Sequence, residues 1–199
     1  MRQSKGSAFG GKAAFLDRDG TIIQENGYIS QIKQIELIPG SIEAIKRLKL
    51  LGYKIIVITN QSGVAQGYFT EKTLKKVHGY LQKELKKNKA GWDGIYYCPH
   101  HPRVGLKRYL KNCNCRKPKT GLVKLAVREH KLKLKDSVVI GDKLFDVGLG
   151  KNAKIKSILV LTGHGKKEAK KIGTFPKSRP DFIAKNLLEA VQLLQKPER

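Results

Sequence analysis

The chain has 199 residues, 40% of them hydrophobic, and its 41 Lys and Arg residues against 16 Asp and Glu residues give a formal net charge of +25. This length is enough to bury the core of one domain, and this apolar content excludes a disordered chain. No apolar run approaches the roughly 18 residues of a membrane span, and the polar start of the chain lacks the apolar core of an export signal. We therefore expect a cytoplasmic protein with a flexible lead-in over residues 1–12 and one domain over residues 13–196.

The first predicted elements are a short buried strand, a helix and a longer strand. The strand covers residues 13–16 and ends at Asp17. Residues 39–41 (PGS) open a helix whose apolar residues recur at helical spacing, and Gly52 ends it. The β-branched run at residues 53–59 (YKIIVIT) is typical of a central strand in a parallel sheet.

The second half of the chain continues this alternation. Thr70 is expected to cap a long helix with one apolar face, formed by Leu74, Val77, Leu81 and Leu85. An irregular stretch runs from the strand at residues 95–97 to Lys119. The remaining pattern predicts a helix at 120–130, strands at 137–140 and 156–161, an edge strand at 181–183 and a closing helix at 186–195. This alternation predicts a three-layer α/β fold with a Rossmann-like parallel sheet.

Polar motifs stand directly after several of the predicted strands. Asp17 follows the first strand, Thr59 the second, and Gly141-Asp142 the fourth. In open α/β sheets, ligands bind beyond the carboxyl ends of the strands. The sequence therefore predicts one site that gathers these residues.

The motif Asp17-Arg18-Asp19-Gly20-Thr21 carries two carboxylates at one strand end. Carboxylates are hard oxygen ligands suited to Mg²⁺, one carboxylate can attack phosphorus, and a second can act as general acid and base. Gly20 permits the turn that would aim both at one site. The alternative interpretation is an ordinary polar turn with both acids in solvent.

Three further motifs suit a phosphoryl group and a metal ion. The polar loop at residues 59–63 (TNQSG) offers hydroxyl, amide and backbone N–H groups, and Arg116-Lys117 offers fixed positive charge. Asp142 can supply a second carboxylate to a metal, and Asp146 can orient Lys117 or bind a metal-bound water. Each motif also has a structural interpretation, as a polar loop, a surface basic pair or an acidic helix start.

Together these four motifs, in this order, resemble those of the haloacid dehalogenase superfamily of phosphotransferases over residues 13–165. The resemblance implies that superfamily's fold without a large cap domain, with Asp17 as nucleophile and Asp19 as general acid and base. It implies that Thr59 and Lys117 steady the transferring phosphoryl group. It also implies Mg²⁺ held by Asp17, Asp142 and the backbone carbonyl of Asp19.

The three cysteines lie close together in the sequence, and this clustering indicates a metal-binding site as one interpretation. They form a C-x-H pair and a C-x-C pair, Cys98 with His100 and Cys113 with Cys115. Three thiolates and one imidazole suit a structural Zn²⁺ that closes a loop over residues 98–115. His101 is an alternative ligand, and three reduced, partly buried cysteines are the alternative to a metal site.

A narrower resemblance rests on longer segments around these motifs. Residues 94–102 (GIYYCPHHP), 113–118 (CNCRKP), 59–63, 67–71 (GYFTE) and 141–144 (GDKL) are similar to the bacterial D-glycero-D-manno-heptose 1,7-bisphosphate 7-phosphatases. This resemblance implies sugar or phosphate contacts by Glu25, Asn26, Gly27, Tyr28, Thr59, Asn60, Gln61, Ser62, Arg116, Lys117 and Lys143. Glu25 and Asn26 replace the pair that is commoner in that family. The implied role is heptose 1-phosphate formation for ADP- or GDP-activated heptose, destined for lipopolysaccharide or surface glycans.

Other functions stay open at this point. Histidinol-phosphate phosphatases share the zinc ligands, although the twelve residues between His100 and Cys113 favour the heptose enzymes. The charge of +25 also suits a phosphatase of nucleic-acid ends or a nucleic-acid binder without activity. The chain has no aromatic-rich basic segment for stacking bases, which argues against nucleic acid as a partner. We expect a monomer, and for Lys143 the alternative contacts are Asp146 or solvent.

Overall fold

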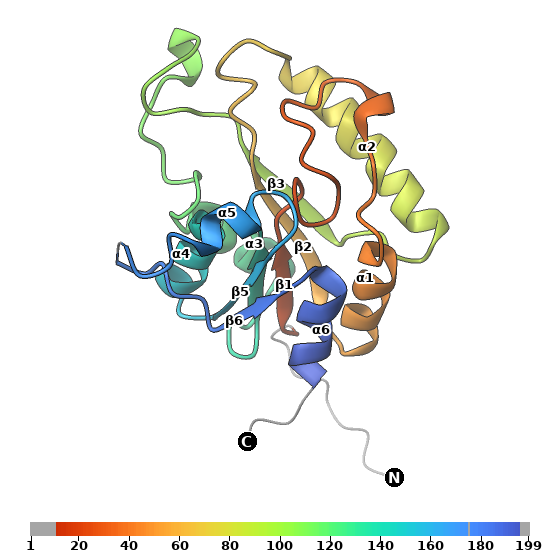
Figure 1. Ribbon diagram of the computed structural model, residues 1–199. Helices are drawn as coiled ribbons and strands as arrows, with labels where there is room; N and C mark the ends of the chain where they lie inside the picture. Colours follow the sequence, from red (N-terminus) through yellow and green to blue (C-terminus); the bar gives the residue numbers. More distant parts are fainter. Residues whose placement is uncertain (1–10, 175, 196–199) are drawn as a thin grey trace.

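The computed structural model describes residues 11–174 and 176–195, and their strands form one parallel sheet (Figure 1). The strands are β1 (Ala13–Leu16), β2 (Lys54–Asn60), β3 (Gly94–Cys98), β4 (Val138–Gly141), β5 (Lys156–Val160) and β6 (Phe182–Ala184). Their spatial order is β3-β2-β1-β4-β5-β6, which confirms the predicted parallel sheet and puts β6 at its edge. The predicted lead-in lies outside the described residues except for Gly11 and Lys12, and the Lys12 carbonyl accepts a hydrogen bond from Lys54 N at 3.0 Å.

Helices cover both faces of this sheet, as predicted for a three-layer fold. One face packs against α1 (Ser41–Leu50), α2 (Glu71–Lys87) and α6 (Leu187–Gln195). The other packs against α3 (Gly121–His130), α4 (Leu144–Ala153) and α5 (Gly165–Ala169). Two short 3-10 helices, η1 (Ile32–Gln34) and η2 (Lys107–Tyr109), lie in loops.

Local sequence explains why these elements begin and end where they do. The Thr70 side chain accepts a hydrogen bond from Thr73 N at 3.1 Å and so caps α2 as predicted. The apolar face of α2 lies in the core, with Leu74, Val77, Leu81 and Leu85 all buried. The central strands β1 and β4 are buried along their whole length because helices cover both of their faces.

The order of the strands fixes where a ligand can bind. The chain starts at β1, proceeds to β2 and β3 on one side, and then returns to place β4 on the other side. Asp17 N donates a hydrogen bond to Ile140 O at 3.0 Å, so the carboxyl ends of β1 and β4 are directly adjacent. This junction is the switch point at which open α/β sheets bind their ligands.

Two long connections leave the carboxyl ends of the strands, residues 17–40 after β1 and residues 99–120 after β3 (Figure 1). In the described part of the chain, neither of them contains more than a 3-10 helix and isolated β-bridges, so no large cap domain is present there. No helix among the described residues is both long and apolar enough to cross a lipid bilayer.

Candidate active site

Three buried carboxylates meet at the switch point. Asp17 follows β1, Asp142 follows β4, and Asp146 lies in the first turn of α4. All three are at most 5% exposed, and each offers an oxygen within 4.8 Å of the others. A Cβ added to Gly20, whose φ is +75°, would lie 2.2 Å from an Asp142 carboxylate oxygen, so only glycine permits this close approach.

Lys117 holds two of these carboxylates. Its Nζ lies 2.9 Å from Asp17 and 2.6 Å from Asp146, and it donates to Ile58 O at 2.9 Å. Burial alone would lower the pKa of Lys117, but the carboxylates of Asp146 and Asp17 raise it above its usual range. Likewise, burial alone would raise the pKa of Asp17, but Lys117 lowers it. Of the two roles open to Asp146 from the sequence, the geometry matches the orientation of Lys117.

Asp142 lacks a full set of partners. Its Oδ2 accepts a hydrogen bond from His164 N at 2.8 Å, whereas its Oδ1 has no hydrogen-bond partner among the described residues. The nearest described cation to Oδ1, Lys143 Nζ, is 3.9 Å away. Burial raises the pKa of Asp142 to about 8 and that of Asp146 to about 6. A buried, unpartnered carboxylate oxygen beside two further carboxylates fits a divalent cation with a preference for oxygen ligands.

Asp19 lies apart from this carboxylate cluster. Arg18 and Gln61 occupy its carboxylate, with Arg18 Nη2 at 2.7 Å from Oδ1 and Gln61 Nε2 at 2.8 Å from Oδ2. Gln61 Nε2 also donates to Thr59 Oγ1 at 2.9 Å, and Thr59 is buried. The Asp19 carboxylate is therefore occupied by these partners, and the metal contact of its backbone carbonyl, which the family resemblance implies, stays a prediction.

A cleft of about 350 Å³ adjoins these groups and shares Asp19 and Gln61 with them. Its lining consists of Asp19, Glu25, Gly27, Tyr28, Asn60, Gln61, Ser62, Arg116, Lys143, Phe145 and His164. Asn26, predicted as a sugar contact, is not in this lining and donates to Gln34 O at 3.1 Å instead. The Lys143 ammonium pairs with Glu25 at 2.7 Å, a partner outside the two alternatives from the sequence, while Lys143 N donates to Asp146 Oδ2 at 3.2 Å.

The cleft and the groups beneath it include residues that the sequence patterns do not indicate. Arg18 and His78 are buried beside Asp19, and Phe145 and His164 line the rim of the cleft. His164 Nε2 lies 3.4 Å from the Glu25 carboxylate. A Phe and a His outside any motif carry no local signal, and only the tertiary fold brings them to the cleft.

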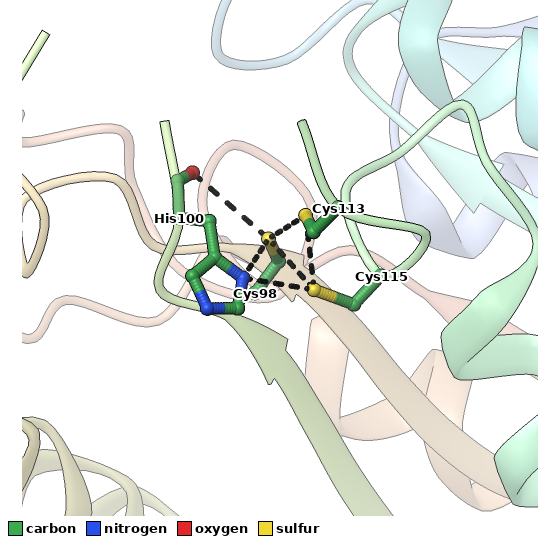
Figure 2. A group of neighbouring side chains, drawn as sticks. All are labelled: Cys98, His100, Cys113 and Cys115. Carbon is green, nitrogen blue, oxygen red and sulfur yellow. Dashed lines mark hydrogen bonds between the residues drawn. The ribbon is translucent and has the colours of Figure 1, made fainter. Parts of the chain in front are cut away.

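The predicted zinc ligands converge in one cluster (Figure 2). The three sulfur atoms lie 3.1 to 3.5 Å apart, and His100 Nδ1 is 3.2 Å from Cys115 Sγ and 3.7 Å from Cys98 Sγ. Atoms this close fit a tetrahedral ion with ligand bonds of about 2.0–2.3 Å. His101 has a different role, because its Nδ1 accepts hydrogen bonds from Arg103 N and Val104 N.

The loop that carries these ligands also packs against the cleft. Leu106 N donates to Ala65 O at 2.6 Å, and a Cβ at Gly105 would lie 2.2 Å from that oxygen. Arg116 Nη1 donates to His100 O at 3.2 Å, and Lys117 N donates to Asn60 Oδ1 at 3.0 Å. The loop therefore braces the 60–66 segment, from which three residues line the cleft.

Glu71 ties this loop to α2. Its carboxylate accepts hydrogen bonds from Tyr97 Oη at 2.7 Å and Tyr109 Oη at 2.8 Å. The hydrogen bond from Tyr97, and to a lesser extent that from Tyr109, lowers the pKa of Glu71 below its ordinary value of 4.5. The stabilisation that the charge provides is therefore present above pH 4.5 and is lost as the pH falls through the folded-state pKa.

We expect Glu71→Gln to lower the free energy of unfolding at neutral pH by about 1 kcal/mol, because hydrogen bonds to a charged acceptor are the stronger ones. The difference between the variant and the wild type should shrink as the pH falls below 4.5. Urea unfolding of both proteins at a series of pH values measures it. Glu84→Gln on the same helix is the matched control, since the Glu84 carboxylate forms a surface i,i+3 pair with Lys87. A difference that grows towards acid pH would contradict the prediction.

Comparison with known proteins agrees with this geometry. Residues 114–190 match the HAD-hydrolase-like family model. The chain is 44% identical over 164 residues to the D-glycero-beta-D-manno-heptose-1,7-bisphosphate 7-phosphatase of Pasteurella multocida, covering 79% of this chain and 89% of that protein. It is 35% identical over 189 residues to the enzyme of the same name from Escherichia coli K12, covering 94% and 95%.

A similar fold occurs in a solved structure of a named enzyme. The D,D-heptose 1.7-bisphosphate phosphatase from B. bronchiseptica, complexed with magnesium and phosphate, superposes with a TM-score of 0.80 at 31% identity. The match covers 94% of this chain and 99% of that one. That enzyme's magnesium agrees with the cation that the carboxylate cluster here would accept.

Proposed function

We propose, from the premise that this chain belongs to the D-glycero-beta-D-manno-heptose-1,7-bisphosphate 7-phosphatase family of HAD-like hydrolases, that it removes the 7-phosphate of that heptose bisphosphate. The observation that carries the proposal is the group of Asp17, Asp142, Asp146 and Lys117 at the switch point, next to a cleft whose lining residue His164 donates to Asp142. One phosphatase domain over residues 13–196 would contain the whole site.

In the first step, a carboxylate oxygen of Asp17 attacks the phosphorus of the 7-phosphate. The bond from phosphorus to the sugar oxygen breaks, and its electron pair leaves with that oxygen, which takes a proton from the Asp19 carboxyl group. Lys117 keeps Asp17 ionised for this attack and offers positive charge to the phosphoryl oxygens, and Thr59 would steady the phosphoryl group. The product is a phosphoaspartate on Asp17.

In the second step, the Asp19 carboxylate takes a proton from water, and the water oxygen attacks the phosphorus. The bond from phosphorus to Asp17 breaks and returns its electron pair to the Asp17 carboxylate, which releases inorganic phosphate. Asp19 thus serves as acid and then as base at the same position.

Asp17, Asp142 and the Asp19 backbone carbonyl would hold Mg²⁺, and the unpartnered Oδ1 of Asp142 supports this assignment. When bound, Mg²⁺ neutralises the negative charge that gathers between the phosphoryl group and the carboxylates. Asp146 would orient Lys117 through their ion pair at 2.6 Å.

The cleft suits a sugar that carries a second phosphate. Arg116 and Lys143 contribute cations to the lining, and Glu25, Gly27 and Tyr28 contribute a carboxylate, a backbone and an aromatic face. Asn60, Gln61 and Ser62 also line the cleft and add amide and hydroxyl groups. Asn26 remains a proposed contact that would need to turn from Gln34. We place the reaction in the cytoplasmic formation of ADP- or GDP-activated heptose.

The proposed Zn²⁺ on Cys98, His100, Cys113 and Cys115 would be structural, with four protein ligands and no open position. Removal of this zinc by a chelator, with Mg²⁺ kept in excess, should lower the melting temperature. A loss of about 2 kcal/mol corresponds to roughly 4–8 °C for a chain of this size. Differential scanning fluorimetry with metal analysis measures this shift, and Cys115→Ser should reproduce it. An unchanged melt after verified zinc loss would rule out the structural role.

We also propose a monomer that acts on a small phosphorylated sugar. The exposed large hydrophobic residues of the described chain are spread over several loops, helices and the edge strand β6, and this spread supports the proposal. Light scattering in solution tests it.

Phosphate release with Mg²⁺ tests the function, with heptose 1,7-bisphosphate and histidinol phosphate assayed side by side. We expect a large preference in kcat/KM for the bisphosphate, with the 1-phosphate left intact. A preference for histidinol phosphate would keep the chemistry and replace the substrate. Hydrolysis of neither compound would refute the proposal and direct the search to phosphorylated nucleic-acid ends.

A further inference from the structure

Arg18 stands between the two aspartates of the first motif, and its side chain is buried. Arg18 is 1% exposed and is among the largest fully buried side chains of the described residues. Burying a guanidinium is unfavourable unless close partners compensate for the lost water. Its contacts therefore indicate what the fold gains from this residue.

The guanidinium of Arg18 contacts the Asp19 carboxylate through two nitrogens. Nε donates to Oδ1 at 3.0 Å, and Nη2 lies 2.7 Å from Oδ1 and 2.9 Å from Oδ2. Nη2 also donates to Gln61 Oε1 at 3.2 Å, and Gln61 Nε2 returns a hydrogen bond to Asp19 Oδ2 at 2.8 Å. Arg18, Asp19 and Gln61 thus form a closed ring of hydrogen bonds, called the Asp19 clamp below.

His78 on α2 fixes the other side of Arg18. Its Nε2 lies 2.9 Å from Arg18 Nη1, and its ring meets that of Tyr97 edge-on with centroids 5.7 Å apart. Burial, assisted by the charge of Arg18, lowers the pKa of His78 to about 3. His78 is therefore neutral, and its Nε2 accepts the hydrogen bond from Arg18. The second aspartate of the motif is thereby linked through Arg18 to the core helix α2.

We propose that Arg18, held by His78, is a positioning residue that fixes the Asp19 carboxyl group for proton transfer to the departing sugar oxygen and from the attacking water. The inference rests on the proposed phosphoaspartate chemistry, in which Asp19 exchanges both protons. The backbone N of Arg18 donates to Asp17 Oδ1 at 2.7 Å, whereas its guanidinium is bonded to Asp19, Gln61 and His78. The attack by Asp17 depends on Lys117 and the carboxylate cluster, which lie outside the clamp.

Because attack depends on Asp17 and Lys117 while protonation depends on Asp19, the effect of Arg18 should depend on the leaving group. A sugar alkoxide needs a proton as it departs, so its release needs a well-placed Asp19. A 4-nitrophenolate is stable without a proton, so its release needs only Asp17. Hydrolysis of the phosphoaspartate needs Asp19 as base with either substrate. A residue that only supported the fold would affect both substrates alike.

The experiment compares wild type with Arg18→Met on heptose 1,7-bisphosphate and on 4-nitrophenyl phosphate. We expect kcat/KM for the sugar substrate to fall by about 10²-fold or more, the contribution of a placed general acid. For 4-nitrophenyl phosphate, kcat/KM should stay within a few-fold of wild type. Rapid mixing of the variant with 4-nitrophenyl phosphate should give a burst of nitrophenolate close to one per enzyme, followed by slow turnover. Equal losses on both substrates without a burst would overturn the inference.

Further variants keep the test decisive if Arg18→Met does not fold. His78→Ala removes the anchor of Arg18 and should lower the ratio of sugar to aryl kcat/KM in the same direction. His78→Gln, whose amide oxygen can accept the same hydrogen bond, should restore the ratio towards wild type. Lys76→Met removes an exposed charge from α2 and should leave both substrates unaffected. If His78→Ala leaves the ratio unchanged, the inference fails.

Failure of the proposed function gives a different result from failure of this inference. If wild type releases no phosphate from the sugar bisphosphate, or if Asp17→Asn remains active, the phosphoaspartate chemistry itself is wrong. If wild type is active through Asp17 and the Arg18 and His78 variants keep the wild-type ratio, only the role of Arg18 is wrong.

Discussion

Asp17→Asn is expected to lower kcat on heptose 1,7-bisphosphate by on the order of 10⁴-fold or more, because the variant has no carboxylate to accept the phosphoryl group. The fold should persist. The substitution keeps the size of the side chain and removes one of three carboxylates that lie within 4.8 Å of one another. Phosphate release measures the activity, and a melting curve measures the fold.

Trapping distinguishes loss of the nucleophile from loss of substrate binding. Acid quenching of wild type during turnover, followed by mass spectrometry, should show a phosphorylated peptide containing Asp17, which the variant should lack. Inorganic phosphate should still compete for binding in the variant. Asp17→Asn with turnover near that of wild type would refute the phosphoaspartate mechanism.

Lys117→Met is expected to remove activity and to destabilise the protein by about 3–5 kcal/mol, the cost of leaving buried charges without their partner. Lys117 is 3% exposed and holds both Asp17 and Asp146, which are themselves buried. Once the ammonium is lost, these two carboxylates face each other and Asp142 without their direct ion-pair partner. Urea unfolding and phosphate release measure the two effects.

A second substitution tests the cause of this destabilisation. Asp146→Asn added to Lys117→Met should recover part of the lost stability, because it removes one of the uncompensated carboxylates. Lys166→Met, at an exposed position on α5, is the control for loss of a lysine and should change stability by well under 1 kcal/mol. If Lys117→Met cost no more than this control, the ion pairs in the site would be of little energetic importance.

Much of the fold could be predicted from the residues because its strands are short apolar runs that end in recognisable motifs. The order of strands and motifs predicts that Asp17, Thr59 and Asp142 lie together at the carboxyl ends of neighbouring strands. They do lie there, at the ends of β1, β2 and β4. The helix α4 could not be predicted in this way. It contains Gly148 and Gly150, which disfavour a helix in isolation. The fold requires both, since a Cβ would lie 2.9 Å from Pro118 at Gly148 and 2.8 Å from Ser157 at Gly150.

The candidate site was predictable where the type of residue and its spacing together indicate one kind of chemistry. The carboxylates and the Cys and His pairs are of this kind. Arg18 and His78 are different, because an arginine between two aspartates in sequence indicates a solvated charge as readily as a buried one. Only the packing of α2 against the loop after β1 puts His78 at 2.9 Å from Arg18. Contacts of this sort depend on tertiary structure and leave no periodic pattern.

The contact of Gly105 and Leu106 with Ala65 joins the metal loop to the wall of the substrate cleft. Two ligands that both order the same backbone are thermodynamically linked, and the linkage is reciprocal. A phosphorylated ligand that orders residues 60–66 should therefore slow the escape of the proposed zinc to a chelator, and zinc should tighten the binding of that ligand by the same factor. On this view, the zinc available in the cell would set how tightly the enzyme binds its sugar substrate, as well as how long the folded enzyme persists.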